Sequence, residues 1–445
     1  MTTPVRKNDR IAILNALQAG VAPSRGLEHL QVGRGEEVSA LTQDLGHVKD
    51  GGSAVRFIVG EYGAGKSFFL QVIRQAAQRA GFVTMQADIT QDSRLYGTDG
   101  RVRALHSSLV ASAGTKTQPE GGAMGEVLER FIDSCGVIAR ERGEDREDVI
   151  RERLVALEKY RGGYEFVDVI LSYAEAVRQG DEERRSGVLR WLRGEYRIKS
   201  EARAAIGVNG MIGDADLFPS MRLMASLVRL AGYAGLLVEL DEMGVLLRLN
   251  RVTRDANYEQ VLTMVNSLLG GHADHLMMVF AGVPEFVTHP TTGLYSYGAL
   301  RQRLSGNRFA GGDLQDNSGP VIELQQLVVE DLYVLLENVH RVFCSNGQRD
   351  PVDGELGEAI SAFLEHAGAQ LGGFTQLTPR EATRSWLQFL SILVQNPRQA
   401  WRPLLGQVGV HEDTGPAVTD SFPLFSSSTA EVSDSNDGDL AGFRV

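Results

Sequence analysis

The chain has 445 residues, of which 43% are hydrophobic and 23% are charged, so it is long enough for two or three folded domains. Its 45 basic and 57 acidic residues give a net charge of -12, which argues against coating of nucleic acid by bulk positive charge but leaves local basic patches open. The sequence contains neither a long apolar run nor a secretory signal, so we expect a soluble, cytoplasmic protein with no membrane contact.

The chain begins with a helical pattern and continues with five strand-like runs. Residues 1–50 are predicted to form an N-terminal helical segment, with apolar residues from Ile11 to Leu17, a turn at 22–26 and a second helix from about 35 to 45. Short runs rich in β-branched and aromatic residues follow at 55–59, 82–87, 236–240, 276–281 and 321–324. Separated by helical stretches, they predict an α/β fold with a parallel five-stranded sheet over residues 51–325.

The strands are unevenly spaced, and this predicts additional helical parts. The long interval between the second and third runs reads as amphipathic helix, so we expect a helical insertion over about residues 100–230. Helical candidates at 330–345, 355–370 and 379–395 predict a small bundle over residues 326–405. The Ser- and Asp-rich residues 406–445 are predicted to be a disordered acidic tail. Cys135 and Cys344 cannot form a disulfide framework or a cysteine-rich metal site, and both are predicted to be buried thiols.

The strongest functional signal is a phosphate-binding loop between the run at 55–59 and a helix over 68–80. The loop matches G-x-x-x-x-G-K-S at Gly60, Glu61, Tyr62, Gly63, Ala64, Gly65, Lys66 and Ser67, and Phe68 follows it. Glycines let backbone N–H groups point at phosphate oxygens, Lys66 would reach the β- and γ-phosphates, and the Ser67 hydroxyl would bind Mg²⁺. The motif therefore predicts ATP and Mg²⁺ as cofactors; the alternative is a glycine-rich turn without a ligand.

A second carboxylate motif ends the third strand-like run. Asp241 follows the buried run 236–240, at the edge where parallel sheets bind ligands, and would complete the Mg²⁺ site with Ser67. Glu242 would polarise the attacking water. The alternative for this pair is helix N-capping. Glu239, inside the run, is unusual for a buried strand.

The Asp-Glu pair resembles that of the additional-strand P-loop ATPases, and of the AAA+ group in particular. The resemblance implies that strand 276–281 lies between the Asp-Glu strand and the P-loop strand, and that a polar first sensor follows it. Val283 is apolar at that position, which leaves Glu285 or Thr288 as substitutes.

The same resemblance assigns roles to several arginines. Arg301 or Arg303, with Arg308 soon after, would supply an arginine finger to a neighbouring subunit, and the bundle 326–405 would be a lid. Arg380 resembles the second sensor, and Val32, Gly33 and Arg34 resemble an adenine-side entry segment. For each arginine the alternative is an ordinary solvated or capping residue.

Several stretches together resemble the ATP-binding proteins of bacterial BREX phage-defence loci, of the BrxD type. They are residues 19–27, 32–34, 59–68, 280–286 and 377–381. The resemblance implies an ATPase that works with a helicase or another defence partner, with DNA as a further candidate. A basic segment, Arg184 to Arg203 with Trp191 and Tyr196, could meet single-stranded DNA, or it could be a charged helix balanced by its glutamates.

The leading hypothesis is a homo-oligomeric, Mg²⁺-dependent ATP hydrolase coupled to a DNA-processing defence complex. Its catalytic residues would be Lys66, Glu242, an arginine finger and Arg380. One alternative is a nucleotide-gated switch or scaffold with negligible turnover, motivated by the apolar Val283. Another is a transposition regulator or initiator-like loader.

Overall fold

The computed structural model describes residues 4–306, 316–371 and 377–406, so Arg308 and nearly all of the predicted tail lie outside the described residues. The fold is α/β and contains a five-stranded, all-parallel sheet with the strand order β2-β3-β4-β1-β5, which confirms the predicted fold class. The strands are β1 (Ser53–Val59), β2 (Val83–Asp88), β3 (Leu236–Asp241), β4 (Leu276–Gly282) and β5 (Val321–Glu323). The strand β4 lies between β3 and β1, as the AAA+ resemblance implied.

The register of the sheet aligns the carboxyl ends of its strands. Val59 pairs with Gly282, Asp88 pairs with Asp241, and both pairs lie where their strands end. The strands β1, β3 and β4 are almost fully buried because helices cover both faces, and this accounts for their nearly continuous apolar sequences. Polar groups that follow the strands are thereby gathered at one edge of the sheet.

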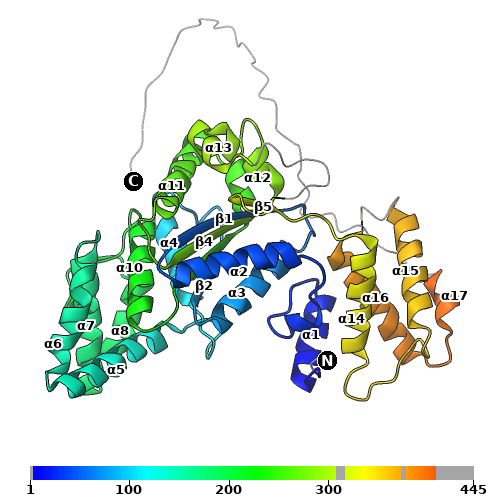
Figure 1. Cartoon of the computed structure of the whole chain (residues 1–445), viewed down its shortest axis with the longest axis horizontal. Coiled ribbons are helices and arrows are strands. Elements are labelled where there is room, and N and C mark those ends of the chain that lie inside the picture. The colour runs from blue at the N-terminus through cyan, green and yellow to red at the C-terminus, as the bar shows by residue number, and fades with distance from the viewer. Residues whose placement is uncertain (1–3, 307–315, 372–376, 407–445) are drawn as a thin grey trace, which may run out of the picture. The chain divides into compact units, whose positions relative to one another are not determined.

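One face of the sheet packs against α2 (Gly35–Lys49) and α3 (Lys66–Arg79), which cross in front of it in Figure 1. Leu41 and Leu45 of α2 and Ile73 of α3 lie on the inward side of these helices and are buried against strand residues such as Met277. The spacing of these apolar residues matches one stripe of an α-helix. Burial of this stripe fixes the start of α3 beside the end of β1.

The opposite face of the sheet belongs to the largest apolar cluster, in which Phe57 and Phe280 stack with ring centroids 4.9 Å apart. Helices between β2 and β3 and helices after β3 contribute to this cluster. Their bounds are α4 (Arg101–Ala111), α5 (Met124–Arg142), α6 (Arg146–Leu154), α7 (Gly163–Gln179), α8 (Glu182–Leu192), α9 (Lys199–Ile206), α10 (Leu217–Leu230), α11 (Arg251–Leu269), α12 (Pro284–Thr288) and α13 (Gly298–Leu304). We call α4 to α10 the intervening helices.

The remaining helices form a separate apolar cluster around Trp386, whose ring contacts Phe363 and Phe389 at centroid distances of 5.2 and 5.4 Å. The helices are α1 (Lys7–Gln18), α14 (Val329–Phe343), α15 (Leu356–Leu371), α16 (Pro379–Gln395) and α17 (Trp401–Leu405). The N-terminal helix α1 belongs to this cluster through Ile13 and Leu14, and it lies beside α14 in Figure 1. We call α14 to α17 the C-terminal helices.

The two cysteines differ in their surroundings. Cys135 is buried in α5, as predicted, whereas Cys344 at the end of α14 is only partly buried, so the prediction of a second buried thiol is wrong. A residue at a helix end packs on fewer sides than one in the middle of a bundle. Across the described ranges, no helix combines the length and apolar character needed to cross a membrane.

Candidate nucleotide-binding site

The loop between β1 and α3 has the backbone shape that its glycines permit. Gly63 and Gly65 have φ angles of 79° and 89°, in the left-handed region that side chains disfavour. A Cβ atom on Gly63 would lie 2.7 Å from Cγ2 of Thr378, the N-cap of α16. Gly63 thus allows both the turn and the close approach of a C-terminal helix.

Lys66, the first residue of α3, folds back over the loop. Its Nζ donates hydrogen bonds to the carbonyl oxygens of Gly60 (2.7 Å) and Glu61 (3.0 Å). Burial lowers the pKa of the Lys66 ammonium, while the carboxylates of Asp241 and Glu242 oppose that shift. The Lys66 ammonium thus lies beside the phosphate-binding loop, where a phosphate oxygen could replace either carbonyl oxygen as its hydrogen-bond acceptor.

Ser67 and Asp241 meet in the structure, although 173 residues of sequence lie between them. The Ser67 hydroxyl lies 3.4 Å from Oδ2 of Asp241 and is positioned to donate to it, and Oδ1 of Asp241 accepts the backbone N–H of Glu242 at 2.8 Å. A hydroxyl and a carboxylate next to a phosphate-binding loop are the hard oxygen donors that Mg²⁺ prefers. This donor set fits the predicted Mg²⁺ ligands.

Glu242 has a backbone conformation that is uncommon for a non-glycine residue, with φ at 56°. Its carboxyl group is partly withdrawn from solvent inside the cavity, which raises its pKa, and the neighbouring Asp241 charge raises the pKa further. Its exposed side chain lines the same cavity as Lys66 and Ser67. Strained conformations of this kind persist where surrounding structure fixes them, and they are frequent at functional sites.

A second cavity, which Ser67 and Glu242 also line, includes residues that the sequence analysis missed. Arg74 of α3 donates from Nε and Nη2 to Oε2 of Glu239 at 2.8 and 2.6 Å, which explains a glutamate inside a buried strand. Asp88 pairs with Asp241 in register, and burial together with the Asp241 charge raises the pKa of Asp88. Its position directly after the predicted strand 82–87 was a signal that could have identified Asp88.

The main cavity extends from the loop to an apolar region between α1, α2 and the C-terminal helices. Arg34 and Val32 line it, and Arg34 donates through Nη2 to the carbonyl oxygens of Ala64 (2.8 Å) and Gln325 (2.6 Å). Gly33 does not line the cavity; its φ of 62° lets the backbone pass Asp331. The apolar lining residues include Leu17, Val21, Leu30, Val38, Phe68, Val72, Leu327 and Leu335.

Arg380 connects the C-terminal helices to the loop. Its Nη1 donates to the Tyr62 hydroxyl at 2.8 Å, and its guanidinium lies 5.3 Å from the centre of the Tyr62 ring. The helix α16 starts with a capping box between Thr378 and Glu381, which fixes the first turn that carries Arg380. The structure therefore brings Arg380 into the same cavity as Lys66 and Glu242.

A comparison with protein families identifies the chain. The family model of the BREX system ATP-binding protein BrxC/D matches residues 5–408. The chain belongs to this family. Its function therefore includes ATP binding in a phage-defence system. No curated protein matches the chain.

Two arginines of this BrxC/D-family chain lie outside the nucleotide cavity, and they differ from one another. Arg303 of α13 is half-buried and donates to Oδ1 of Asn266 and, at 2.8 Å, to the carbonyl oxygen of Ala299. Arg301 is exposed, and among the described residues its guanidinium has no hydrogen-bond or ion-pair partner. Neither reaches the ATP-binding loop of its own chain, so a role in catalysis requires a second subunit.

The candidates for the first sensor do not line the cavity in this BrxC/D-family chain. Val283 packs toward Gly244, just after Glu242, and a Cβ atom on Gly244 would lie 3.2 Å from its Cγ2. The Thr288 hydroxyl donates to the carbonyl oxygen of Pro284 in its own helix. Glu285 is exposed in the first turn of α12. The apolar residue at position 283 thus has a packing role.

The basic segment at 184–203 is mostly paired within the BrxC/D-family fold. Arg184 donates to the Ser172 hydroxyl at 2.9 Å, Arg190 donates to Glu195 at 3.2 Å, and Arg185 and Arg193 also contact glutamates. Trp191 and Tyr196 are buried, so neither ring offers a face for base stacking. Arg197, Lys199 and Arg203 remain exposed. The interpretation as a charged helix with balancing glutamates fits these contacts better than a single-strand platform.

Proposed function

We propose that this BrxC/D-family protein hydrolyses ATP with Mg²⁺ as its cofactor. The observation that carries the proposal is that Ser67, Asp241 and Glu242 line one cavity, while Ser67 and Glu242 also line the adjoining cavity that contains Lys66. ATP binding alone needs the loop, whereas hydrolysis also needs a carboxylate that can take the proton of an attacking water. Glu242 supplies that carboxylate next to the residue assigned to the metal.

Each residue of the cavity has a specific task in this proposal. Loop N–H groups and Lys66 would bind the β- and γ-phosphates, and Ser67 and Asp241 would hold Mg²⁺, whose charge would offset that of the phosphates. Glu242 orients water and accepts its proton. Arg34 and the apolar side chains near it contact the adenosine part. Arg380 couples the presence of the nucleotide to the position of the C-terminal helices. The raised pKa of Glu242 suits a group that must accept a proton.

We further propose that the active form is a homo-oligomer in which Arg301 acts on the nucleotide of a neighbour. The guanidinium of Arg303 is already bound to Asn266 and to its own helix, whereas that of Arg301 is exposed. An arginine delivered to the γ-phosphate stabilises charge in the transition state and is worth roughly 10³- to 10⁵-fold in rate. Oligomerisation would therefore control turnover.

A mixing experiment tests both proposals. ATP turnover by the full chain should rise more than linearly with protein concentration and should vanish in Lys66→Ala. Arg301→Ala should lower turnover by about 10³-fold. Arg303→Ala, on the same helix, is the matched control and should keep turnover. An equal mixture of Arg301→Ala and Glu242→Gln should recover activity, because some interfaces then pair an intact Arg301 with an intact Glu242.

The outcomes of this experiment separate the hypotheses. Turnover that is linear in protein concentration, with no recovery in the mixture, contradicts the finger in trans but leaves hydrolysis standing. Tight ATP binding without turnover at every concentration, with and without DNA, contradicts hydrolysis. It would favour a nucleotide-gated switch, for which the contact of Arg380 with Tyr62 is the supporting observation.

The wider role that we propose is coupling of this cycle to a DNA-processing defence complex with a helicase or another large partner. The family match to a phage-defence ATP-binding protein supports this proposal. Contact with DNA would use exposed basic residues such as Arg197, Lys199 and Arg203. Stimulation of turnover by DNA that is lost when these three are replaced by glutamine would support it. Unchanged stimulation would exclude this surface.

A further inference from the structure

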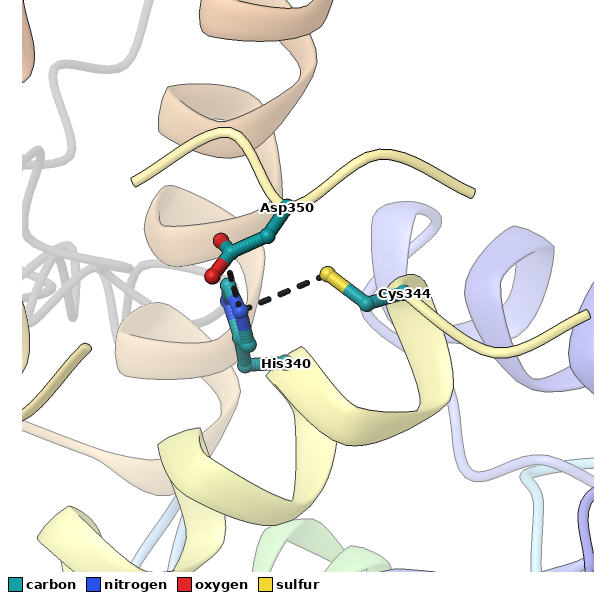
Figure 2. A group of neighbouring side chains, drawn as sticks. All are labelled: His340, Cys344 and Asp350. Carbon is teal, nitrogen blue, oxygen red and sulfur yellow. Dashed lines mark hydrogen bonds and ion pairs between the residues drawn. The ribbon is translucent and has the colours of Figure 1, made fainter. Parts of the chain in front are cut away.

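Three side chains of different chemistry converge at the end of α14, far along this helix from the nucleotide cavity. His340 and Cys344 are four residues apart and therefore lie on the same side of the helix, and Asp350 comes from the loop that follows (Figure 2). One ligand atom from each residue lies within 4.8 Å of the others. The imidazole is buried, while the thiol and the carboxylate are partly exposed.

The convergence has an unusual feature, because both partners approach the same ring nitrogen. His340 Nε2 lies 3.3 Å from Sγ of Cys344 and 3.2 Å from Oδ1 of Asp350. A neutral imidazole nitrogen carries either one proton or one lone pair, so it serves one of these partners well and not both. Nδ1 of the same ring is buried and, within the described chain, has no hydrogen-bond partner.

This arrangement is unsuited to nucleophilic catalysis. A cysteine nucleophile needs its base on one ring nitrogen and the orienting carboxylate on the other. Here the carboxylate and the thiol share Nε2. A positive ion between the three atoms, in contrast, would satisfy all of them at once.

Two of the three separations, those from His340 Nε2, are close to the ligand spacing of a tetrahedral zinc site, and Cys344 Sγ lies within 4.8 Å of Asp350 Oδ1. Zn–N bonds of about 2.0 Å, Zn–O bonds of about 2.0 to 2.2 Å and Zn–S bonds of about 2.3 Å at tetrahedral angles place neighbouring ligand atoms about 3.3 to 3.6 Å apart. The observed separations of 3.3 and 3.2 Å lie at the lower end of this range or just below it and would need only a small outward adjustment. Thiolate, imidazole and carboxylate are all known zinc ligands, and a thiolate disfavours Mg²⁺ or Ca²⁺.

The carboxylate is already oriented by its own loop. Oδ1 of Asp350 accepts the N–H of Val352 and Oδ2 accepts that of Gly354, each at 3.0 Å. Outer hydrogen bonds of this kind fix a metal ligand before the ion arrives. The exposed side of Asp350 leaves room for water as a fourth ligand.

We propose that His340 Nε2, Cys344 Sγ and Asp350 Oδ1 bind one Zn²⁺ ion that ties the loop after α14 to the end of that helix. The residue before Cys344 also contacts the helix α1: Arg10 of α1 donates two hydrogen bonds, of 3.1 and 2.8 Å, to the Phe343 carbonyl oxygen. Both α1 and α14 contribute residues to the wall of the nucleotide cavity, Leu17 and Leu335. The ion is structural in this role and takes no part in hydrolysis.

Cobalt provides a direct test, because Co²⁺ bound to a thiolate absorbs in the near ultraviolet. The sample is the full chain with its affinity tag removed, stripped of metal and titrated with Co²⁺ without nucleotide. We expect a thiolate-to-cobalt band that saturates at one ion per chain and is abolished by stoichiometric Zn²⁺. Cys344→Ala should remove the band. Cys135→Ala, which removes the other thiol, should keep it.

A second pair of variants tests the carboxylate without touching sulfur. Asp350→Asn should weaken Zn²⁺ binding by about tenfold or more. Asp353→Asn, in the same loop, is the matched control and should bind normally. Zn²⁺ should also raise the Tm of the parent chain but not that of Cys344→Ala.

The proposal is overturned by any of three results. The first is the absence of a thiolate band at saturating Co²⁺. The second is a band that survives in Cys344→Ala. The third is a rise in Tm with Zn²⁺ that is the same in the parent chain and in Cys344→Ala, which would mean adventitious binding elsewhere. Circular dichroism of Cys344→Ala shows whether the variant is folded, so that loss of the band reflects loss of the ligand.

Discussion

The polar residues at the carboxyl ends of the strands, such as Lys66, Ser67 and Asp241, form what we call the nucleotide edge of the sheet. This edge and the intervening helices use polar side chains in opposite ways. At the edge, the hydrogen bonds that Lys66 makes within the described ranges go to loop carbonyl oxygens, and the Ser67 to Asp241 contact is long at 3.4 Å. In the intervening helices, Arg153 bonds to the Ser134 hydroxyl and the Leu230 carbonyl oxygen, both at 2.6 Å, and lies 5.1 Å from the Phe131 ring centre.

This difference in hydrogen bonding distinguishes side chains that bind a ligand from side chains that hold helices together. Groups that must exchange partners for a ligand are left with weak or replaceable contacts, whereas groups that hold helices together are saturated by short ones. Changes at the edge should therefore alter ATP chemistry more than the free energy of unfolding. Changes away from it should do the reverse.

The largest effect is expected at the edge, for Glu242→Gln. Loss of the proton acceptor should lower ATP turnover by about 10²- to 10⁴-fold, while ATP affinity and Tm stay close to those of the parent chain. Steady-state kinetics, nucleotide titration and thermal melting measure the three quantities. Unchanged turnover would show that Glu242 does not accept the proton of the attacking water, and it would contradict the proposed catalytic role.

The ion pair of Arg74 with Glu239 lies under the edge and should behave as a packing contact. Arg74→Met leaves the Glu239 carboxylate buried without its partner and should lower the free energy of unfolding by about 3 kcal/mol at neutral pH. The double variant Arg74→Met with Glu239→Gln should recover most of that loss. Denaturant unfolding of both variants measures the coupling, and equal destabilisation of both would contradict it.

The buried side chain of His106, in α4, should make the free energy of unfolding depend on pH. Burial lowers the pKa of His106 to about 4, and its Nε2 lies 2.8 Å from the Leu192 carbonyl oxygen. Between about pH 6.5 and 4 the unfolded chain binds a proton that the folded chain excludes, so this contribution to stability, about 3 kcal/mol, is lost as pH falls. It is fully present above pH 6.5.

The matching variant is His106→Gln, whose amide can still donate to Leu192. Its unfolding free energy should depend less on pH in that window than that of the parent chain. His272→Gln, which changes an exposed histidine, is the control and should keep the parental slope. A parental slope in His106→Gln as well would assign the acid sensitivity to other groups.

The smallest effect is expected for Tyr62→Phe, which tests the link between the edge and the C-terminal helices. The variant removes the hydrogen bond from Arg380 but keeps the ring beside the guanidinium. A single exposed hydrogen bond contributes about 1 kcal/mol, so ATP affinity should change by less than about tenfold. Arg380→Ala should change it more. Equal ATP affinities in the parent chain, Tyr62→Phe and Arg380→Ala would show that this contact does not couple the C-terminal helices to nucleotide binding.

Much of the edge could be predicted from sequence, because its chemistry is encoded in short contiguous motifs. The P-loop from Gly60 to Ser67 follows a strand and begins a helix, and Asp241 ends another strand, as predicted. Arg74 and Asp88 were missed because their importance depends on which residue lies across from them. The burial of Trp191 and Tyr196 was also not predicted, since a basic aromatic segment reads the same whether its rings face inward or outward.

The sequence by itself determined the α/β class, the parallel strands and the ATP-binding motif, because strand periodicity and phosphate binding depend on neighbouring residues. Only the tertiary structure decided that Arg301 rather than Arg303 has an exposed guanidinium, and that Arg380 reaches Tyr62. It also decided that His340, Cys344 and Asp350 converge. These outcomes depend on contacts between elements distant in the chain or on the path of a loop, and local patterns carry no information about either.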